Sequence, residues 1–441
     1  MAGDVMVALG PATADRQTLF AHNCSLRAEE LALLHRRPGK EFAPGERICT
    51  PCWQLPQARR TRTVLASRKR SDWGYLDGLN DQGLALGSVG GRTRCSAPDE
   101  SALQASDLVR LVLERCDHAR QGVDLLTQLI EEHGQRAGPV HDLAGDGFFL
   151  LADRDEAFLV ETSGRRWACQ EVLRVRAASN VCTIHQDWDH ISPGLAQDAI
   201  SHGWWRGDGS KLDFAEALAE CPTGDHSALR RWGRATMLLE QQSGHIDVPF
   251  LRRLLGDHYE GTHFERQEPA QPGQPVAICQ HAAAGCGTAT GVSVIMELGI
   301  PGERLPCAWC AFGPGCSTVY LPVFIQGELP DAGVEQATEL DPARWHGGIL
   351  GRGGKTDPAL DARLAALQAR LDGAGQQFAA RGAKLAERGS PQDLDRQATA
   401  FLDEQCQLMD ELASATTQLN RASSAAQPAR SARTMSQQGA G

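Results

Sequence analysis

Residues 5–9 read Val-Met-Val-Ala-Leu, residues 10–13 read Gly-Pro-Ala-Thr, and residues 18–25 read Thr-Leu-Phe-Ala-His-Asn-Cys-Ser. Two short apolar runs on either side of a Gly-Pro turn predict a β-hairpin that starts almost at the first residue. A chain end is usually loose unless it is paired into a sheet. Because the first run is nearly all apolar, we expect this end of the chain to be a buried strand.

The opening residues resemble those of the secernins and the related bacterial cysteine dipeptidases, which are N-terminal-nucleophile (Ntn) hydrolases. That family opens with Cys-Asp-Thr-Phe-Val-Ala-Leu-Pro-Pro-Ala-Thr and continues with Lys-Asn-Ser-Asp-Arg. Here residues 3–13 read Gly-Asp-Val-Met-Val-Ala-Leu-Gly-Pro-Ala-Thr, and residues 22–26 read His-Asn-Cys-Ser-Leu. The nucleophilic cysteine of the family therefore falls on Gly3.

The resemblance continues in the same order over residues 3–326. Residues 72–87 read Asp-Trp-Gly-Tyr-Leu-Asp-Gly-Leu-Asn-Asp-Gln-Gly-Leu-Ala-Leu-Gly, where the family has Leu-Trp-Gly-Ala-Glu-Met-Gly-Ala-Asn-Glu-His-Gly-Val-Cys-Ile-Gly. Residues 178–180 read Ala-Ser-Asn, where the family has Ile-Ser-Asn. The resemblance implies an α+β fold, an Ntn-hydrolase-like αββα sandwich of two antiparallel sheets between helical layers.

The residue pattern is consistent with such layers. Apolar residues recur at helical spacing over residues 101–134, which predicts two helices. Apolar runs at residues 148–153 and 157–162 flank a charged turn and predict a hairpin. Helices that alternate with paired strands in blocks indicate a layered α+β domain.

An Ntn hydrolase needs a thiolate, a free amine, donors for the oxyanion and a charged frame that holds the amine. Carried over by position, the family nucleophile is Gly3, the Asp of its Asn-Ser-Asp motif is Ser25, and the Asn of its Gly-Asn-Glu motif is Ser88. Three positions keep the family residue, namely Asn23, Asn180 and Arg231. The resemblance implies a site at these six positions in which hydrogen-bond donors and a guanidinium survive, while the thiolate and the carboxylate are lost.

Two accounts of the missing cysteine stay open. In the first, the chain is a catalytically silent or altered relative, since loss of the nucleophile typically costs several orders of magnitude in rate. In the second, Cys24 has taken over, because it lies on the strand that returns beside Gly3. A buried apolar role for Cys24 is the plainer interpretation.

The function implied by the resemblance is hydrolysis of the amide bond of a dipeptide or another small amine-bearing substrate. The family uses an N-terminal nucleophile for this and needs no metal or organic cofactor, so none is expected here. The alternative is a non-catalytic binding or interaction protein that has kept the cleft. In either case the expected partner is a small peptide or amide.

Composition limits the remaining possibilities. The 441 residues carry a net charge of −11, which disfavours nucleic acid as the main partner. No apolar run approaches the roughly 18–20 residues that span a bilayer, so no membrane partner is expected. An acidic residue, Asp4, stands where a signal peptide would have basic ones, which predicts a cytoplasmic protein. The 14 cysteines are then expected to be reduced.

Two groups of cysteines and histidines deserve comparison with metal sites. Cys49 and Cys52, and likewise Cys307 and Cys310, have the spacing of one half of a zinc site, but the halves are far apart in sequence. A second, irregularly spaced group consists of His185, His190, Cys279 and His281. For both groups ordinary packing is the favoured interpretation, and no metal ligand is assigned.

The last part of the chain differs in kind from the rest. Leucine, alanine and phenylalanine recur at helical spacing from Leu360 to Leu412, which predicts two amphipathic helices. We expect an Ntn-hydrolase-like domain at residues 1–330, a linker at 331–356, a helical hairpin at 357–420 and a disordered tail at 421–441. The hairpin is expected to pack on the core or on a partner, including a second copy of the chain.

Overall fold

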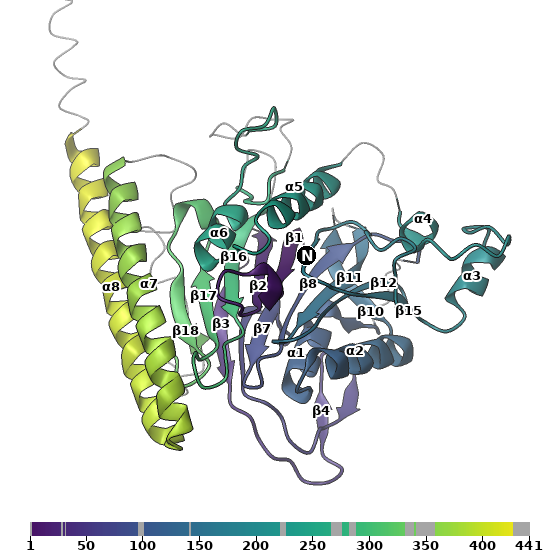
Figure 1. Cartoon of the computed structure of the whole chain (residues 1–441), viewed down its shortest axis with the longest axis horizontal. Coiled ribbons are helices and arrows are strands. Elements are labelled where there is room, and N and C mark those ends of the chain that lie inside the picture. The colour runs from purple at the N-terminus through teal and green to yellow at the C-terminus, as the bar shows by residue number, and fades with distance from the viewer. Residues whose placement is uncertain are drawn as a thin grey trace, which may run out of the picture.

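The chain is described by a computed structural model that covers residues 2–27, 30, 32–95, 101–140, 143–220, 226–265, 276–281, 288–330, 339–340 and 358–426. Within these residues two β-sheets lie face to face between helical layers (Figure 1). The predicted αββα sandwich with a C-terminal helical pair is therefore confirmed.

The first sheet holds the start of the chain. It has six strands among the described residues, and every neighbouring pair is antiparallel. The strands, in spatial order, are β14 (Val175–Ala178), β1 (Ala2–Ala8), β2 (Leu19–Arg27), β16 (Thr288–Glu297), β17 (Cys307–Ala311) and β18 (Leu321–Phe324).

The second sheet is larger and has eleven described strands. Its main path is β15 (His190–Ile191), β13 (Arg166–Glu171), β12 (Ala157–Ser163), β11 (Leu143–Ala152), β8 (Ala85–Gly91), β7 (Asp77–Asn80), β6 (Val64–Lys69), β3 (Ala32–Arg37) and β19 (Glu339–Leu340). In addition, β10 (Gln135–Val140) pairs with β11, and β9 (Leu103–Gln104) pairs with β10. A separate hairpin is formed by β4 (Arg47–Cys49) and β5 (Gln54–Pro56). The predicted hairpin at residues 148–162 is confirmed as β11 and β12.

Helices cover the outer faces of both sheets. Helices α1 (Ala105–Arg115) and α2 (Ala119–His133) pack on the larger sheet, as predicted for residues 101–134. Helices α5 (Ser227–Gln241) and α6 (Val248–Leu255) pack on the six-stranded sheet. The short helices α3 (Leu195–Ser201) and α4 (Phe214–Leu218) lie at the far end of the molecule from the helical pair (Figure 1).

The opening hairpin is confirmed, and it is buried on both faces. Strand β1 pairs with β2 from Ala2 opposite Ser25 to Ala8 opposite Leu19. Val5 and Val7 face the larger sheet, while Met6 and Ala8 face α5 and α6. This is why the strand is a continuous apolar run and not an alternating one.

The hairpin turn requires its glycine. Residues Gly10–Ala12 form a short 3-10 turn. A Cβ on Gly10 would lie 2.5 Å from the carbonyl oxygen of Arg16, too close for any side chain. Only glycine therefore fits at this position of the predicted Gly-Pro turn.

The C-terminal helices α7 (Pro358–Glu387) and α8 (Pro391–Ala426) form an antiparallel pair beside β18 (Figure 1). Gly389, at φ +72°, separates the two helices, and Pro391 opens the second. Helix α8 extends past residue 420, where we placed the start of a disordered tail, because the added residues include several alanines, which favour helix. The predicted linker and the rest of the tail lie almost entirely outside the described residues.

The apolar faces of this helical pair are largely used within the chain. Leu360, Leu371 and Phe378 of α7 and Phe401 of α8 are all buried. Phe378 stacks on Phe401, with ring centroids 4.8 Å apart, and both rings contact Phe324 of β18. The pair is thus part of the folded core of the protein.

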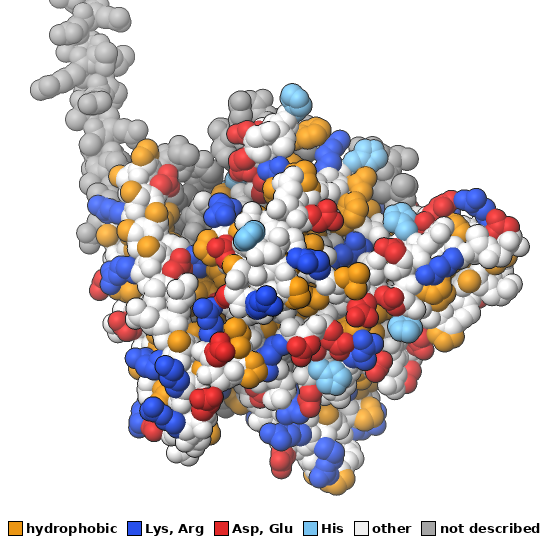
Figure 2. Space-filling view, viewed as in Figure 1, with side chains coloured by type: hydrophobic (Ala, Val, Ile, Leu, Met, Phe, Trp, Pro, Cys, Tyr) orange, Lys and Arg blue, Asp and Glu red, His pale blue; other side chains and the backbone are white. Residues whose placement is uncertain are grey.

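On the face shown in Figure 2, acidic and basic side chains are interspersed. In the described part of the chain, none of the helices is both long enough and apolar enough to cross a bilayer.

Replacing Phe378 by alanine tests how the helical pair is attached. Phe378→Ala should lower the free energy of unfolding by about 3–5 kcal/mol, because it leaves a cavity between the rings of Phe324 and Phe401. Denaturant titration followed by circular dichroism would measure the change. The matched control is Phe264→Ala, at a ring that is 48% exposed. Equal effects of the two substitutions would contradict the described packing.

Candidate functional site

The candidate site begins at Gly3 on β1. Strand β14 pairs with β1 only from Val5 onward, and the chain leaves it at Ala178. The side chain of Asn180 takes the place of the next strand residue, because the Gly3 backbone N–H donates to Asn180 Oδ1 at 3.1 Å. The Asn180 side-chain amide in turn donates to the carbonyl oxygen of Gly90 on β8. Asn180 therefore joins the two sheets beside the start of the chain.

Arg231 of α5 completes this arrangement. Its Nη2 donates to Asn180 Oδ1 at 2.7 Å, and its Nε lies 3.0 and 3.1 Å from the two carboxylate oxygens of Asp4. The hydroxyl of Ser179 donates to the same carboxylate. Asp4 and Arg231 are both buried, so each charge depends on the other for compensation. We refer to Gly3, Asp4, Asn180 and Arg231 as the terminal frame.

The loop that carries Asn180 is fixed by Glu161 of β12. The carboxylate of Glu161 accepts hydrogen bonds from the backbone N–H groups of Thr183 and Ile184 and from the Thr183 hydroxyl, at 2.7–3.0 Å. Burial raises the pKa of Glu161, while these donors act in the opposite direction. The loop is therefore held to the larger sheet independently of the terminal frame.

Residue 3 itself provides no chemistry and no space for it. Gly3 is buried, and a Cβ built on it would collide with the carbonyl oxygen of Asn23 on the neighbouring strand. Ala2 continues the strand and pairs with Ser25, so the Gly3 nitrogen is a peptide amide and not a free amine. A cysteine would fit here only if the strand moved.

An imidazole faces this position from β2. His22 Nδ1 lies 2.8 Å from Asp77 Oδ2 on β7, and the Ser67 hydroxyl donates to the other Asp77 oxygen at 2.7 Å. His22 Nε2 would lie 3.4 Å from a Cβ on residue 3. This nitrogen is buried and has no hydrogen-bond partner among the described residues. The pair was not predicted from the sequence, because Asp77 is distant from His22 along the chain and His22 falls where the family has lysine.

Cys24 stands directly opposite Gly3 on β2, as the hairpin predicts. Its side chain is completely buried among the apolar residues between the sheets. This burial raises the pKa of the Cys24 thiol from 9.0 to about 12. Because the thiolate is the nucleophilic form, the geometry favours the buried apolar role over the catalytic one.

Asn23 is close to residue 3 in the fold but its side chain is used elsewhere. Its amide group donates to the carbonyl oxygens of Leu255 and Ile278, at 2.8 and 3.0 Å. Its Oδ1 accepts from the Ser293 hydroxyl at 2.6 Å. The Asn23 side chain thus ties the end of α6 and the segment 276–281 to the six-stranded sheet.

The two serines that replace family residues occupy different places. Ser25 lies opposite Ala2, next to the terminal frame, and Ser88 lies on β8. Side chains alternate along a strand, so Ser88 shares a face with Leu86, which packs toward α1 and α2. Ser88 is therefore directed away from Gly3. Both hydroxyls are buried without a hydrogen-bond partner among the described residues.

The cysteine pairs noted in the sequence do not form a metal site. Cys49 is exposed on the small β4–β5 hairpin. Cys307 and Cys310 are both buried on β17, but they belong to the cores on opposite faces of the sheet. Of the irregular group, the structure brings together Cys279 and His281, and it adds His258 and Cys316 in place of His185 and His190.

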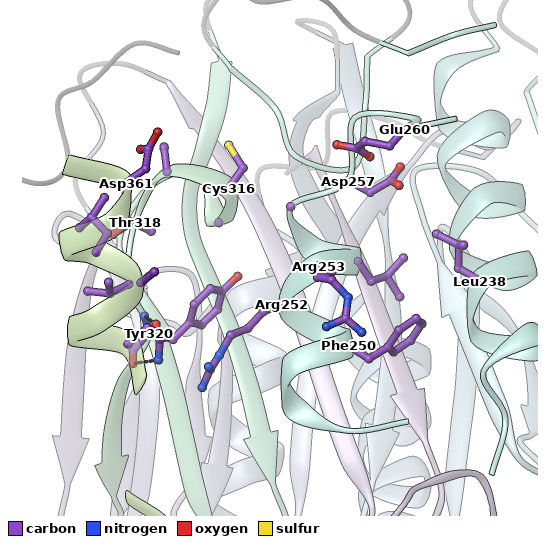
Figure 3. Close-up of a pocket in the computed structure, with 18 of the residues that line it drawn as sticks. Leu238, Phe250, Arg252, Arg253, Asp257, Glu260, Cys316, Thr318, Tyr320 and Asp361 are labelled. Atoms are coloured by element: carbon purple, nitrogen blue, oxygen red, sulfur yellow. Dashed lines mark hydrogen bonds between the residues drawn. The ribbon is translucent and has the colours of Figure 1, made fainter. Parts of the chain in front are cut away.

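A cleft of about 810 Å³ opens beside α6, α7 and the 3-10 turn Gly315–Ser317 (Figure 3). Its wall includes Arg252, Asp257 and Tyr320, and Cys316 and Glu260 lie toward one end of it. This cleft is on the helical side of the six-stranded sheet.

Comparison with known proteins gives distant similarities. No family model matches the chain. Similar solved structures include a C2A mutant of conjugated bile acid hydrolase from Clostridium perfringens, with 12% identity and a TM-score of 0.39 over 77% of this chain and 93% of that one. Penicillin V acylase from Agrobacterium tumefaciens gives 14% identity and a TM-score of 0.41 over 73% and 86%. The N-acylethanolamine-hydrolyzing acid amidase ortholog of Caenorhabditis elegans gives 10% and 0.34 over 68% and 94%. At these values the similarities assign no activity to the chain.

The terminal frame makes a prediction about stability. Arg231→Met should lower the free energy of unfolding by about 3–5 kcal/mol, because it leaves the buried Asp4 carboxylate without its cation. The control is Arg206→Met, which removes an exposed ion pair with Glu216 and should cost less than about 1 kcal/mol. Denaturation curves would compare them. A cost for Arg231→Met as small as that of the control would contradict the buried ion pair.

The environment of Cys24 makes a prediction about reactivity. At pH 8 Cys24 should remain unmodified by iodoacetamide in the native chain, because the thiol is buried and its pKa is raised to about 12. Exposed Cys49 should react within the same period. Peptide mapping by mass spectrometry would measure both sites. Rapid modification of Cys24 would restore it as a candidate nucleophile.

Proposed function

We propose that the chain is a non-catalytic relative of the cysteine-type amidohydrolases, one that binds a small peptide or amide without cleaving it. The observation that carries the proposal is at residue 3. The terminal frame is complete around Gly3, yet the residue has no side chain, and the neighbouring Asn23 carbonyl leaves no space for one.

The substrate class comes from the sequence resemblance to the secernins and cysteine dipeptidases. The retained Asn180 and Arg231 support it, because Asn180 accepts from the Gly3 backbone N–H and Arg231 donates to Asn180. Dipeptides are therefore the first ligands to test. A cytoplasmic location and self-association through the C-terminal helices remain predictions of the sequence.

A second candidate function, hydrolysis by this chain, is favoured by one observation. His22 and Asp77 form a buried pair whose free imidazole nitrogen faces residue 3, as a general base would. Without a side-chain nucleophile at residue 3, however, this base has no acyl-enzyme intermediate to form. The His22–Asp77 pair would therefore act as a general base only if a nucleophile stood at residue 3.

Dipeptide turnover separates the two functions. The native chain should release no amino acids from a dipeptide panel, as followed by liquid chromatography and mass spectrometry. A variant that combines deletion of Ala2 with Gly3→Cys should gain activity, because removal of the initiator methionine then leaves the new cysteine first. Deletion of Ala2 also removes the strand pairing with Ser25, so the new cysteine is free to shift away from the Asn23 carbonyl.

Two controls make the result specific. The same deletion combined with Gly3→Ala should stay inactive, and adding His22→Gln to the cysteine variant should reduce its rate by about 10²-fold or more if the imidazole acts as base. Binding is tested separately by the melting temperature of the native chain with each dipeptide. Turnover by the native chain would contradict the proposal, and so would the absence of any dipeptide that stabilises it.

A further inference from the structure

Two histidines and two cysteines converge on one point between α6 and the 3-10 turn Gly315–Ser317. His281 Nε2 lies 3.1 Å from His258 Nε2, 3.6 Å from Cys279 Sγ and 3.2 Å from Cys316 Sγ. All four atoms lie within 4.8 Å of one another. We call these four residues the His/Cys cluster.

Hydrogen bonding among the four side chains explains only part of this geometry. The Cys316 sulfur can accept from Cys279, His258 and His281, but the two imidazole Nε2 donors would then lie 3.1 Å apart. The Nε2 atom of an imidazole carries either one hydrogen or one lone pair, so it makes one good hydrogen bond. Here a single Nε2 has three polar neighbours within 3.6 Å. A cation at the centre satisfies all four atoms at once.

Three of the six separations are close to those of a tetrahedral zinc site. Zn–N bonds of about 2.0–2.1 Å and Zn–S bonds of about 2.3 Å place ligand atoms roughly 3.3–3.8 Å apart around a tetrahedron. Of these three separations, 3.6 Å lies within this range, and 3.1 and 3.2 Å lie just below it. Two thiolates with two imidazoles form one of the usual structural zinc sets.

The backbone holds the ligands in place before any metal binds. The Cys279 N–H donates to the carbonyl oxygen of Asp257, the residue before His258, at 3.1 Å. Gln280 lies between Cys279 and His281. Its backbone N–H donates to the Thr290 hydroxyl of β16, and its carbonyl oxygen accepts from the Thr290 N–H. The side-chain amide of Asn23 donates to the carbonyl oxygen of Ile278, the residue before Cys279. The site is therefore preorganised from several elements.

One ligand also has an outer partner of the kind that zinc sites use. His258 Nδ1 lies 3.5 Å from the carboxylate of Glu260, which leaves Nε2 directed at the other ligands. A carboxylate at the second ring nitrogen orients a histidine and makes it a stronger ligand.

We propose that His258, Cys279, His281 and Cys316 bind one Zn²⁺ in a closed, four-coordinate structural site. The resemblance implied no metal, so this site is a departure from the expectation of the sequence. With four protein ligands no coordination position is open to a substrate. The ion would link the turn after α6, the segment before β16 and the turn between β17 and β18, along one end of the cleft in Figure 3.

Metal content tests the proposal on the full chain. Protein reconstituted with Zn²⁺ and then freed of loosely bound ions should retain about one zinc per chain by inductively coupled plasma mass spectrometry. Cys316→Ser and His258→Ala, at the two less buried ligands, should lose at least about tenfold in zinc affinity. Cys49→Ser, which alters an exposed cysteine outside the cluster, should retain zinc like the native chain.

Two further measurements do not depend on how the variants fold. Co²⁺ added to the native chain should give the thiolate charge-transfer band and the intense visible absorption of tetrahedral cobalt. Zn²⁺ should also protect Cys316 from iodoacetamide while Cys49 continues to react. A native chain that retains no zinc, a cobalt spectrum of octahedral type, or equal retention by Cys316→Ser would each overturn the proposal.

Discussion

The structure around the candidate site depends on one amide oxygen, Asn180 Oδ1, which accepts from both the Gly3 backbone and Arg231. Through it, the first residues of the chain are joined to a buried ion pair between Asp4 and Arg231. A chain end has high conformational entropy, and burying a charge without a partner is costly. Pairing of the first strand in the sheet brings Asp4 next to Arg231, which compensates the buried charge. The ion pair in turn stabilises the ordered strand against the entropy of a loose chain end.

Two groups of polar side chains meet at residue 3. The terminal frame approaches residue 3 from the helical side, and the His22–Asp77 pair approaches it from between the sheets. Between them stands a glycine packed against the backbone of β2. Cys24 is the nearest thiol along the sheet, but its burial suppresses the thiolate. Neither residue 3 nor Cys24 therefore presents a reactive thiolate at this point of the fold.

The sequence predicted the elements whose causes are local or periodic. The Gly-Pro turn, the apolar runs of β1 and β2, and the separation of α7 from α8 at Gly389 were all readable from residue type and spacing. Asn180 and Arg231 were found only through resemblance, because nothing local distinguishes them. Asp77, His258 and Cys316 were missed, since their partners lie 55, 23 and 35 residues away in the chain. Ser88 was carried over from the family pattern, and only the structure shows that it shares the face of β8 with Leu86, toward α1 and α2.

The helical side of the six-stranded sheet carries a second centre, the His/Cys cluster, and Asn23 links the two. Its backbone lies against Gly3, while its amide holds the segments that carry the cluster. The terminal frame forms only if the first strand, β1, is stably paired in the sheet. Hydrogen–deuterium exchange of a peptide that covers residues 2–9 tests this most directly. We expect protection equal to that of the central strand β16, whereas exchange within seconds, as in a loose chain end, would contradict the account.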